Sequence, residues 1–207
     1  CDGEHGNEMV RYEVPLVDSS GRTIGYGDRW LTHRVRSGPD GTVLGRKHVG
    51  ITIACLDHAG RILTAHRRHR IFDRVWTLSG DTHPYRVFGS RTPETLPRAA
   101  TRCALDDLGV KIEGWTDRLT VSYAARDPRD PRYCENELLH LMVARHGNQL
   151  RVNKKNAYDV SWVEPARILE DSLEDSERDP IDRKYAPWVH AVFALSPARL
   201  AKALSTG

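Results

Sequence analysis

Two apolar runs joined by a short polar turn place the strongest restriction on how this chain can fold. HVGITIACLD (residues 48–57) and RILTAHR (residues 61–67) are rich in β-branched residues, and DHAG lies between them at 57–60. Two such runs around a turn of this length are typical of a β-hairpin. The middle of the chain is therefore expected to be built from strands.

Further elements follow from local pattern on both sides of this hairpin. Strands are expected at Tyr12–Val17, 73–80, 119–125, 135–146 and 159–163. Helices are expected at Pro97–Leu108, 164–171 and 187–195, with a last short helix beginning at Ser196–Pro197. Gly109 stands in the usual stop position of the first of these helices. The mixture predicts the α+β class.

Length and composition fit one ordinary globular domain. The chain has 207 residues, of which 39% are hydrophobic and 29% charged. We expect a single domain over 1–207, with 1–10 flexible. No apolar run approaches the roughly 20 residues that a membrane span needs, and the start CDGEHGNE is unlike a signal peptide. Cys55, Cys103 and Cys134 are far apart, which favours free thiols and a cytoplasmic protein.

The charge distribution bears on possible partners. The net charge is only +3, although HRRHR at 66–70 is basic and residues 169–182 are acidic. RNA binding, with Trp76 and Tyr85 stacking on bases beside the basic run, is the non-enzymatic alternative. The small net charge argues against it, so no nucleic-acid partner is expected. The oligomeric state is left open.

The stretch CENEL at 134–138 carries two acids at strand spacing. Residues two apart in a strand face the same way, so Glu135 and Glu137 project side by side. Adjacent carboxylates repel one another unless a cation or a shared proton lies between them. Because the strand continues into LLHLMVA, a buried location is expected, and a metal or catalytic role is favoured over two surface charges.

Histidines could supply the rest of a metal site. His33, His48 and His83 each lie at the edge of an expected element. Three imidazoles and two carboxylates would suit Zn, Mn or a similar divalent ion, although a single histidine is more often structural. The stretch WTLSGDTHPYR also places Asp81 two residues before His83, where a strand runs out at Pro84.

The order of these motifs resembles type I isopentenyl diphosphate isomerase, a branch of the Nudix fold. The motifs are GRTIG, His33, His48, WTLSGDTHP, the helix that ends in LG, Tyr123, CENE and YAPWV. They extend from about Val14 to about Leu195. The resemblance implies a Nudix-type fold with mixed β-sheets between helices, and a prenyl diphosphate as the small-molecule substrate.

The resemblance also implies roles for individual residues. The metal ligands would be His33, His48, His83, Glu135 and Glu137. Glu137 would also exchange a proton with the substrate, assisted by Tyr123, while the face of Trp188 would stabilise a carbocation. Asp107 would hold a Mg²⁺ that arrives with the diphosphate. The substrate-binding residues would be Arg29, Arg67, Arg70 and Trp76.

Four positions depart from the pattern of that family, and all of them fall around the expected pocket. Asp81 stands where the family has a catalytic cysteine, Leu78 replaces an asparagine, and Cys103 replaces a basic residue. Gly80 stands where a larger side chain is common. Leu78 and Gly80 are expected to make the cavity less polar and roomier, as a longer prenyl chain would require.

Asp81 leaves three interpretations open. A buried carboxyl near another acid has a raised pKa and can donate a proton, so Asp81 could replace the thiol in double-bond migration. It could instead start a cyclisation, as the acids of proton-initiated terpene cyclases do, or catalysis could have been lost.

Nudix diphosphate hydrolysis is a further alternative. Glu94 and Arg102 fit the hydrolase motif, but Phe88 replaces its glycine, and Cys103, Asp106 and Asp107 replace its acidic run. We therefore expect an isomerase-like enzyme that performs metal-dependent, acid-initiated carbocation chemistry.

Overall fold

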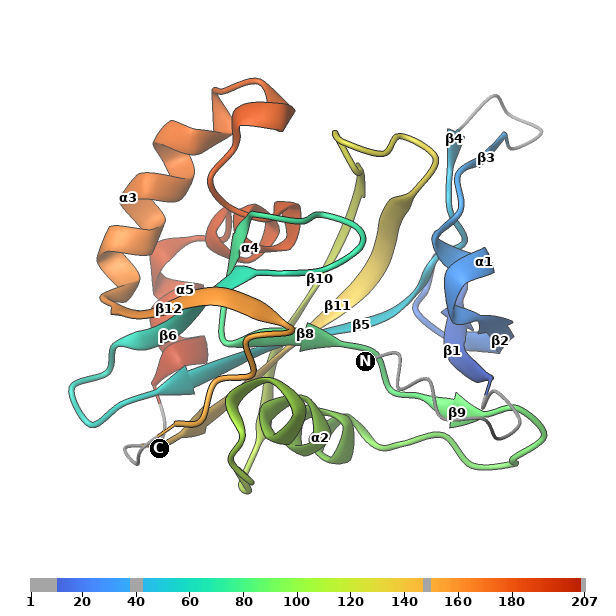
Figure 1. The fold of residues 1–207 in the computed structure, drawn as a ribbon, viewed down its shortest axis with the longest axis horizontal. Coiled ribbons are helices and arrows are strands. Elements are labelled where there is room, and N and C mark those ends of the chain that lie inside the picture. Colours follow the sequence, from blue (N-terminus) through green and yellow to red (C-terminus); the bar gives the residue numbers. More distant parts are fainter. Residues whose placement is uncertain (1–10, 38–42, 147–149, 206–207) are drawn as a thin grey trace.

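A mixed β-sheet forms the centre of the computed structural model, which describes residues 11–37, 43–146 and 150–205 (Figure 1). The sheet follows the order β10–β11–β5–β1–β2, with β5 and β11 parallel and the other neighbours antiparallel. These strands are β10 (Thr116–Arg126), β11 (Cys134–Arg145), β5 (His48–Leu56), β1 (Tyr12–Val17) and β2 (Thr23–Asp28). The expected α+β class is therefore confirmed.

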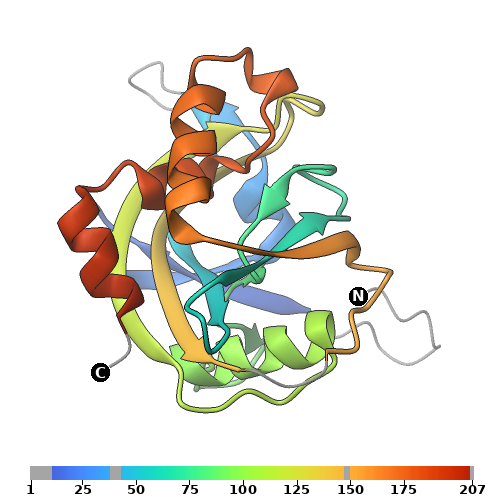
Figure 2. The same ribbon diagram turned by 90° about the vertical axis from the view of Figure 1, so that its left-hand side faces the viewer.

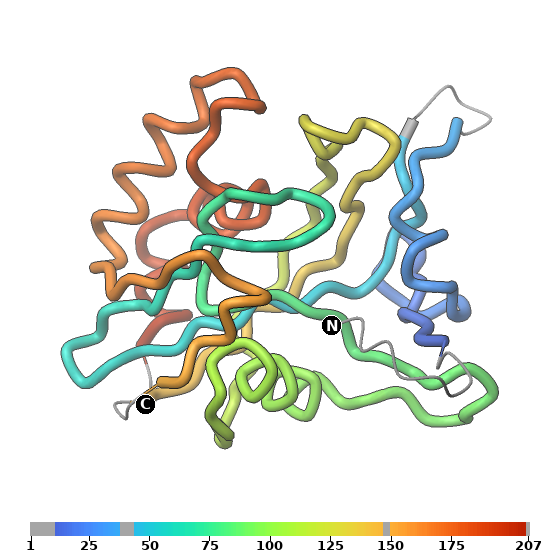
Figure 3. The backbone as a smooth tube through the Cα atoms, viewed as in Figure 1, coloured from blue at the N-terminus to red at the C-terminus, as the bar shows by residue number. Residues whose placement is uncertain are grey.

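The predicted hairpin is present as β5 and β6 (Ile62–Arg67), which pair antiparallel at Leu56 and Ile62 (Figure 3). In its turn, the Asp57 carboxylate accepts hydrogen bonds from the backbone N–H groups of Ala59 and Arg61. The two strands then diverge. β6 pairs with β7 (Trp76–Thr77) and β12 (Ala157–Val163), whereas β5 pairs with β8 (Gly80–Thr82).

The prediction of a single strand at 73–80 is wrong in detail, because the chain changes its pairing partner within this segment. β7 belongs to β6 and β8 belongs to β5, and the crossing lies at Leu78 and Ser79. Ser79 is fully buried and spans both strands, since its N–H donates to the Ile53 carbonyl and its hydroxyl donates to the Leu63 carbonyl.

Helices cover both faces of the sheet (Figure 2). α2 (Leu96–Leu108) packs through its alanines and Cys103 on one face, and Gly109 ends it in the left-handed conformation with φ +68°. On the other face lie α3 (Pro165–Ser176), α4 (Pro187–Phe193) and α5 (Pro197–Leu204). Burial on both faces explains why β5 reads as an almost continuous apolar run.

Alternation along β5 and β11 separates the two cores. Ile51 and Ile53 face α2, whereas Ala54 and Leu56 face the layer of α4 and α5. On β11, Met142 belongs to the α2 side, and Leu139, Leu141 and Val143 to the other. The even positions of β5 and the odd positions of β11 therefore share one face.

Several short elements were not expected from the sequence. The most important is α1 (Arg29–His33), whose N-terminus is capped by the Asp28 carboxylate, which accepts from the N–H of Leu31. The others are β3 (Arg36–Ser37), β4 (Val43–Leu44), β9 (Arg86–Val87) and the 3-10 turn Pro180–Asp182. Among the helices of the described ranges, none combines the length and apolar character of a membrane span. The flexibility expected for 1–10 concerns residues outside these ranges.

Candidate metal centre

Strand register brings the two acids of β11 beside residues from two other strands. Glu137 lies opposite His48 on β5 and opposite Tyr123 on β10. Residues paired across a sheet point to the same face, and so does Glu135, two residues before Glu137. The acidic pair, His48 and Tyr123 therefore lie on the face that carries α4.

β8 and α1 complete the centre. Asp81 pairs with Thr52 on the same face of β5, and His83 follows two residues later. His33 ends the short helix α1, and its ring centroid lies 4.7 Å from that of His48 and 5.0 Å from that of His83. Three histidines far apart in the sequence thus meet beside the acids.

Backbone carbonyls fix how two of these histidines are oriented. Nδ1 of His33 donates to the carbonyl of Arg29, and Nδ1 of His48 donates to the carbonyl of Arg46 at 2.8 Å. A carbonyl oxygen can only accept, so each Nδ1 must carry a proton. This leaves Nε2 of both rings directed at the centre, as is usual for metal-binding histidines.

The ligand atoms lie at the separations that one ion would require. Nε2 of His33 lies 3.0 Å from Oε2 of Glu135, and Nε2 of His83 lies 3.1 Å from Oε1 of Glu137. One ligand atom from each of four buried residues lies within 4.8 Å of all the others; these residues are His33, His48, His83 and Glu135. Glu137 is 5% exposed, and its Oε1 is 3.5 Å from Nε2 of His48.

Chemistry as well as distance supports a cation here. Oε2 of Glu135 is buried and has no hydrogen-bond partner in the part of the chain that the structure describes. It faces Nε2 of His33, a nitrogen that carries a lone pair when Nδ1 holds the proton. Facing lone pairs repel unless an ion or a proton lies between them. The cluster could therefore hold a metal ion, and three imidazoles with carboxylates suit Zn or Mn.

The charges at this centre depend on one another. Burial favours neutral His48, but the facing carboxylates of Glu135 and Glu137 outweigh it and raise the pKa of His48 to about 10. Burial lowers the pKa of His83 to about 4. Although burial opposes ionisation of both acids, the histidines keep the pKa of Glu135 well below its usual range and lower that of Glu137 to about 2. Two carboxylates are thus held in their charged form inside the protein.

Gly50 is a residue of this centre that sequence reasoning missed. A Cβ built at position 50 would overlap the carboxylate of Glu137. Gly50 lies two residues after His48 on β5, so the missing side chain leaves the space that the acid fills. A glycine inside a strand often marks a place where another group closely approaches the backbone. This is the sequence signal that could have identified Gly50.

Tyr123 and Trp188 form the wall beside Glu137. The hydroxyl of Tyr123 donates to Oε2 of Glu137 at 2.6 Å, and its ring centroid lies 6.4 Å from that of Trp188. Trp188 is 3% exposed and contacts Phe72 edge-on at 5.5 Å. The guanidinium of Arg67 lies 5.3 Å from the Trp188 ring centroid, so a cation already lies against this aromatic face.

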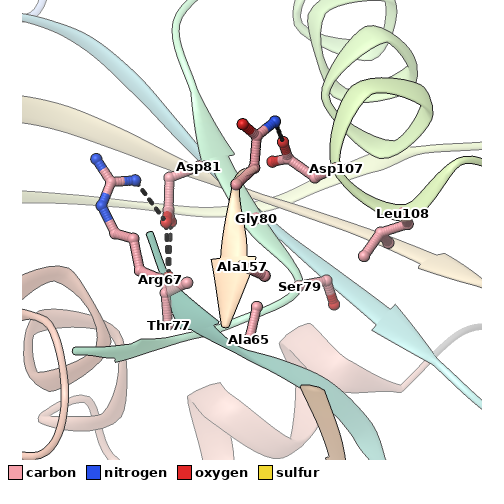
Figure 4. Close-up of a pocket in the computed structure, with 10 residues that line it drawn as sticks. Ala65, Arg67, Thr77, Ser79, Gly80, Asp81, Asp107, Leu108 and Ala157 are labelled. Carbon is pink, nitrogen blue, oxygen red and sulfur yellow. Dashed lines mark hydrogen bonds and ion pairs between the residues drawn. The ribbon is translucent and has the colours of Figure 1, made fainter. Parts of the chain in front are cut away.

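Asp81 lies in the same region, held by Thr77 and Arg67 (Figure 4). The Thr77 hydroxyl lies 2.9 and 2.7 Å from the two carboxylate oxygens, and Nη1 of Arg67 lies 3.6 Å from Oδ2. Burial raises the pKa of Asp81 to about 6, which Arg67 and Thr77 oppose. The charge of Asp81 also contributes to the raised pKa of Tyr123, although burial is the largest cause.

Asp107 is separate from the four-residue cluster. Its Oδ1 accepts from the Asn156 amide at 2.7 Å, and it lines a pocket of about 20 Å³ together with Asp81, Arg67 and Gly80 (Figure 4). A Cβ at Gly80 would lie 3.0 Å from Oδ2 of Asp107. Gly80 therefore makes room for the neighbouring acid, and the pocket itself has room for only one or two water molecules.

The remaining expected site residues are distributed around this region. Arg29 contacts Nε2 of His69 at 3.3 Å, and Arg70 donates to the Tyr133 hydroxyl at 3.1 Å. Trp76 is not brought to the centre, because its ring stacks on His66 at 5.2 Å while Thr77 points inward. Leu78 packs in the apolar core that contains Trp188 and does not line the pocket of Asp81.

Comparison with known proteins gives a distant sequence relative. Isopentenyl-diphosphate Δ-isomerase 1 of Aromatoleum aromaticum is 27% identical over 161 residues, which cover 77% of this chain and 81% of that protein. No protein-family model matches the sequence.

Solved structures give the fold. DR0079 from Deinococcus radiodurans aligns with a TM-score of 0.57 at 13% identity, over 88% of this chain and 97% of that one. The Nudix hydrolase RenU from M. smegmatis aligns at 0.42 with 17% identity, over 88% and 89% of the two chains. The chain is therefore distantly similar in sequence to an isopentenyl-diphosphate isomerase, and its mixed sheet with helices is similar in fold to DR0079.

Proposed function

We propose that this protein catalyses metal-dependent, acid-initiated carbocation chemistry on a prenyl diphosphate, in the form of isomerase-like double-bond migration. The observation that carries the proposal is the pairing of two kinds of acid on one face of the sheet. The raised pKa of Asp81, about 6, lets it take up a proton far more readily than an ordinary carboxyl, whereas Glu137 is held charged. Two acids whose environments separate their pKa values suit opposite roles in proton transfer.

Asp81 is the proton donor in this proposal. Its O–H bond breaks as a C–H bond forms at the terminal carbon of the alkene, which leaves a tertiary cation on the substrate and a carboxylate on Asp81. Arg67, 3.6 Å from Oδ2, is placed to stabilise that carboxylate. A pKa near the working pH favours such a donor, because both protonation states are accessible.

Glu137 and Tyr123 complete the migration. The cation rests against the face of Trp188, an environment that already accepts the guanidinium of Arg67. A C–H bond on the neighbouring carbon then breaks, and its proton passes to the Glu137 carboxylate, to which the Tyr123 hydroxyl is bonded. One proton is added and one removed, so the composition of the substrate is unchanged. Glu137 then releases its proton to solvent, and solvent returns a proton to Asp81.

The metal and the diphosphate have separate binding groups. His33, His48, His83, Glu135 and Glu137 would hold a divalent ion, whose positive charge would compensate the buried acids. We propose Arg29, Arg67 and Arg70 as ligands of the diphosphate, because guanidinium groups match phosphate oxygens in geometry. Asp107 would hold Mg²⁺ beside it, for which the Asn156 amide must release one oxygen.

Cyclisation of a longer prenyl diphosphate is the second candidate, because a carboxylic acid at position 81 could start this reaction as well as double-bond migration. The two reactions differ in the fate of the cation, which either loses a proton to Glu137 or is attacked by a second alkene of the same chain.

Deuterium incorporation distinguishes these reactions. The metal-loaded protein is incubated in D₂O and Mg²⁺ with isopentenyl, dimethylallyl or longer prenyl diphosphates, and the label is located in the products. Exchange into the five-carbon substrates supports isomerisation, and label in a ring supports cyclisation. Release of inorganic phosphate alone would refute both and indicate hydrolysis.

A further inference from the structure

We propose that Thr77 is a positioning residue that ties the proton donor Asp81 to the aromatic wall Trp188 through one hydroxyl group; this inference rests on the proposed function. Trp188 Nε1 lies 2.8 Å from Oγ1 of Thr77. The same oxygen lies 2.7 and 2.9 Å from the carboxylate oxygens of Asp81. Acid and aromatic ring thus share a single bridging atom.

The direction of both hydrogen bonds follows from the donors available. An indole N–H can only donate, so the Thr77 oxygen is the acceptor from Trp188. The one proton of the Thr77 hydroxyl is then free to go to Asp81, whose carboxylate is within reach through both oxygens. Thr77 therefore donates to the Asp81 carboxylate while it accepts from Trp188.

Backbone pairing holds the two ends of this bridge in place. β7 carries Thr77, and Trp76 beside it donates its N–H to the Lys184 carbonyl at 2.8 Å and accepts from the N–H of Ala186 at 2.9 Å. Ala186 immediately precedes α4, which carries Trp188. The segment that presents the aromatic ring is thus bound to the strand that presents the hydroxyl.

Burial makes the bridge selective for a hydroxyl at position 77. Thr77 is 2% exposed and Trp188 3% exposed, so water has little access to replace a lost bond. Thr77→Val keeps the shape of the side chain but leaves the indole N–H and the carboxylate without this partner. Thr77→Ser keeps the hydroxyl and loses only a methyl group.

The proposal predicts a loss in kcat, because the hydrogen bonds of Thr77 go to Asp81 and Trp188, the groups proposed to act on the reacting carbons. We expect Thr77→Val to lower kcat by about 10²-fold, the size of effect that small misplacements cause, while KM changes by less than about threefold. We expect Thr77→Ser to recover most of the loss. Metal content and the thermal midpoint, measured in parallel, report whether each variant folds.

A spectroscopic measurement tests the bridge without turnover. In protein labelled with ¹⁵N at tryptophan indoles, the Trp188 signal is assigned by its loss in Trp188→Phe. We expect that signal to shift in Thr77→Val, to stay close to the wild type in Thr77→Ser, and to shift in Asp81→Asn, because Thr77 connects the two ends. Asp106→Asn, an exposed acid on α2, serves as the control that leaves it unchanged.

The outcomes separate the two proposals. If the wild type turns over no prenyl diphosphate, the proposed function fails, and with it the positioning role. If the wild type is active but folded Thr77→Val keeps its kcat, or Thr77→Ser is as impaired as Thr77→Val, the positioning role alone is overturned. If the Trp188 signal shifts in neither Thr77→Val nor Asp81→Asn, the positioning role is also overturned.

Discussion

The carboxylate of Glu137 occupies the space beside β5 that the missing side chain of Gly50 leaves open. This relationship explains how a bulky, charged side chain of β11 fits against the face of the neighbouring parallel strand β5. It also makes the candidate metal centre sensitive to a single methyl group that carries no charge.

Gly50→Ala should therefore displace Glu137 and weaken metal binding. We expect the bound metal, measured by elemental analysis after dialysis, to fall well below one equivalent, together with any prenyl-diphosphate turnover. The double variant Gly50→Ala/Glu137→Asp, with a shorter acid, should bind metal better than Gly50→Ala alone. Full metal content in Gly50→Ala would show that this close packing is not needed.

Asp81→Asn should stabilise the protein while abolishing turnover. Burial raises the pKa of Asp81 from 3.8 to about 6. The buried carboxylate therefore lowers the free energy of unfolding fully above about pH 6 and not at all below about pH 4. Removing the charge should raise the free energy of unfolding at pH 7.5 by at most about 3 kcal/mol, an upper limit because the side chain is 15% exposed.

The stability gain of Asp81→Asn should disappear near pH 4, and metal content should be unchanged. Chemical denaturation across this pH range measures the effect, and Asp106→Asn is the matched control on an exposed surface. Full activity in Asp81→Asn would remove Asp81 from the mechanism.

Metal binding should release a proton from His48. In the metal-free protein the pKa of His48 is raised from 6.5 to about 10. The protonated ring therefore stabilises the fold fully below about pH 6.5, and this stabilisation is lost as the pH rises through 10. A metal ion must replace that proton, so affinity should rise about tenfold per pH unit between pH 7 and 9. Titration calorimetry in buffers of different ionisation enthalpy counts the proton, and an affinity independent of pH would contradict the prediction.

Glu135→Gln and Glu137→Gln should both lose metal, because each removes a charge that faces the histidines. Glu135 supplies the carboxylate oxygen that lies within 4.8 Å of a ligand atom of all three histidines, so its replacement should have the larger effect. Glu113→Gln makes the same replacement at an exposed glutamate that pairs with Lys111, and this variant should bind metal normally. One full equivalent of metal in Glu137→Gln would restrict the ligand set to the other four residues.

Most elements were predictable because their signals are local. The β5–β6 hairpin, α2 with its stop at Gly109, and the strand of the acidic pair follow from side-chain periodicity and from residues that suit turns and caps. Two features were not predictable in this way. α1 is only five residues long, too short for a periodic pattern, and the break between β7 and β8 depends on which strand each part pairs with.

The sequence by itself determined that Glu135 and Glu137 project together, because a strand repeats every two residues whatever surrounds it. Only the tertiary structure decided that His33, His48 and His83 meet these acids, and that Thr77 joins Asp81 to Trp188. These meetings depend on the register of β11 against β5 and on the docking of α1, β8 and α4. Register and docking are set by packing between segments far apart in the chain. Residue spacing within one segment does not indicate how that segment packs against the others.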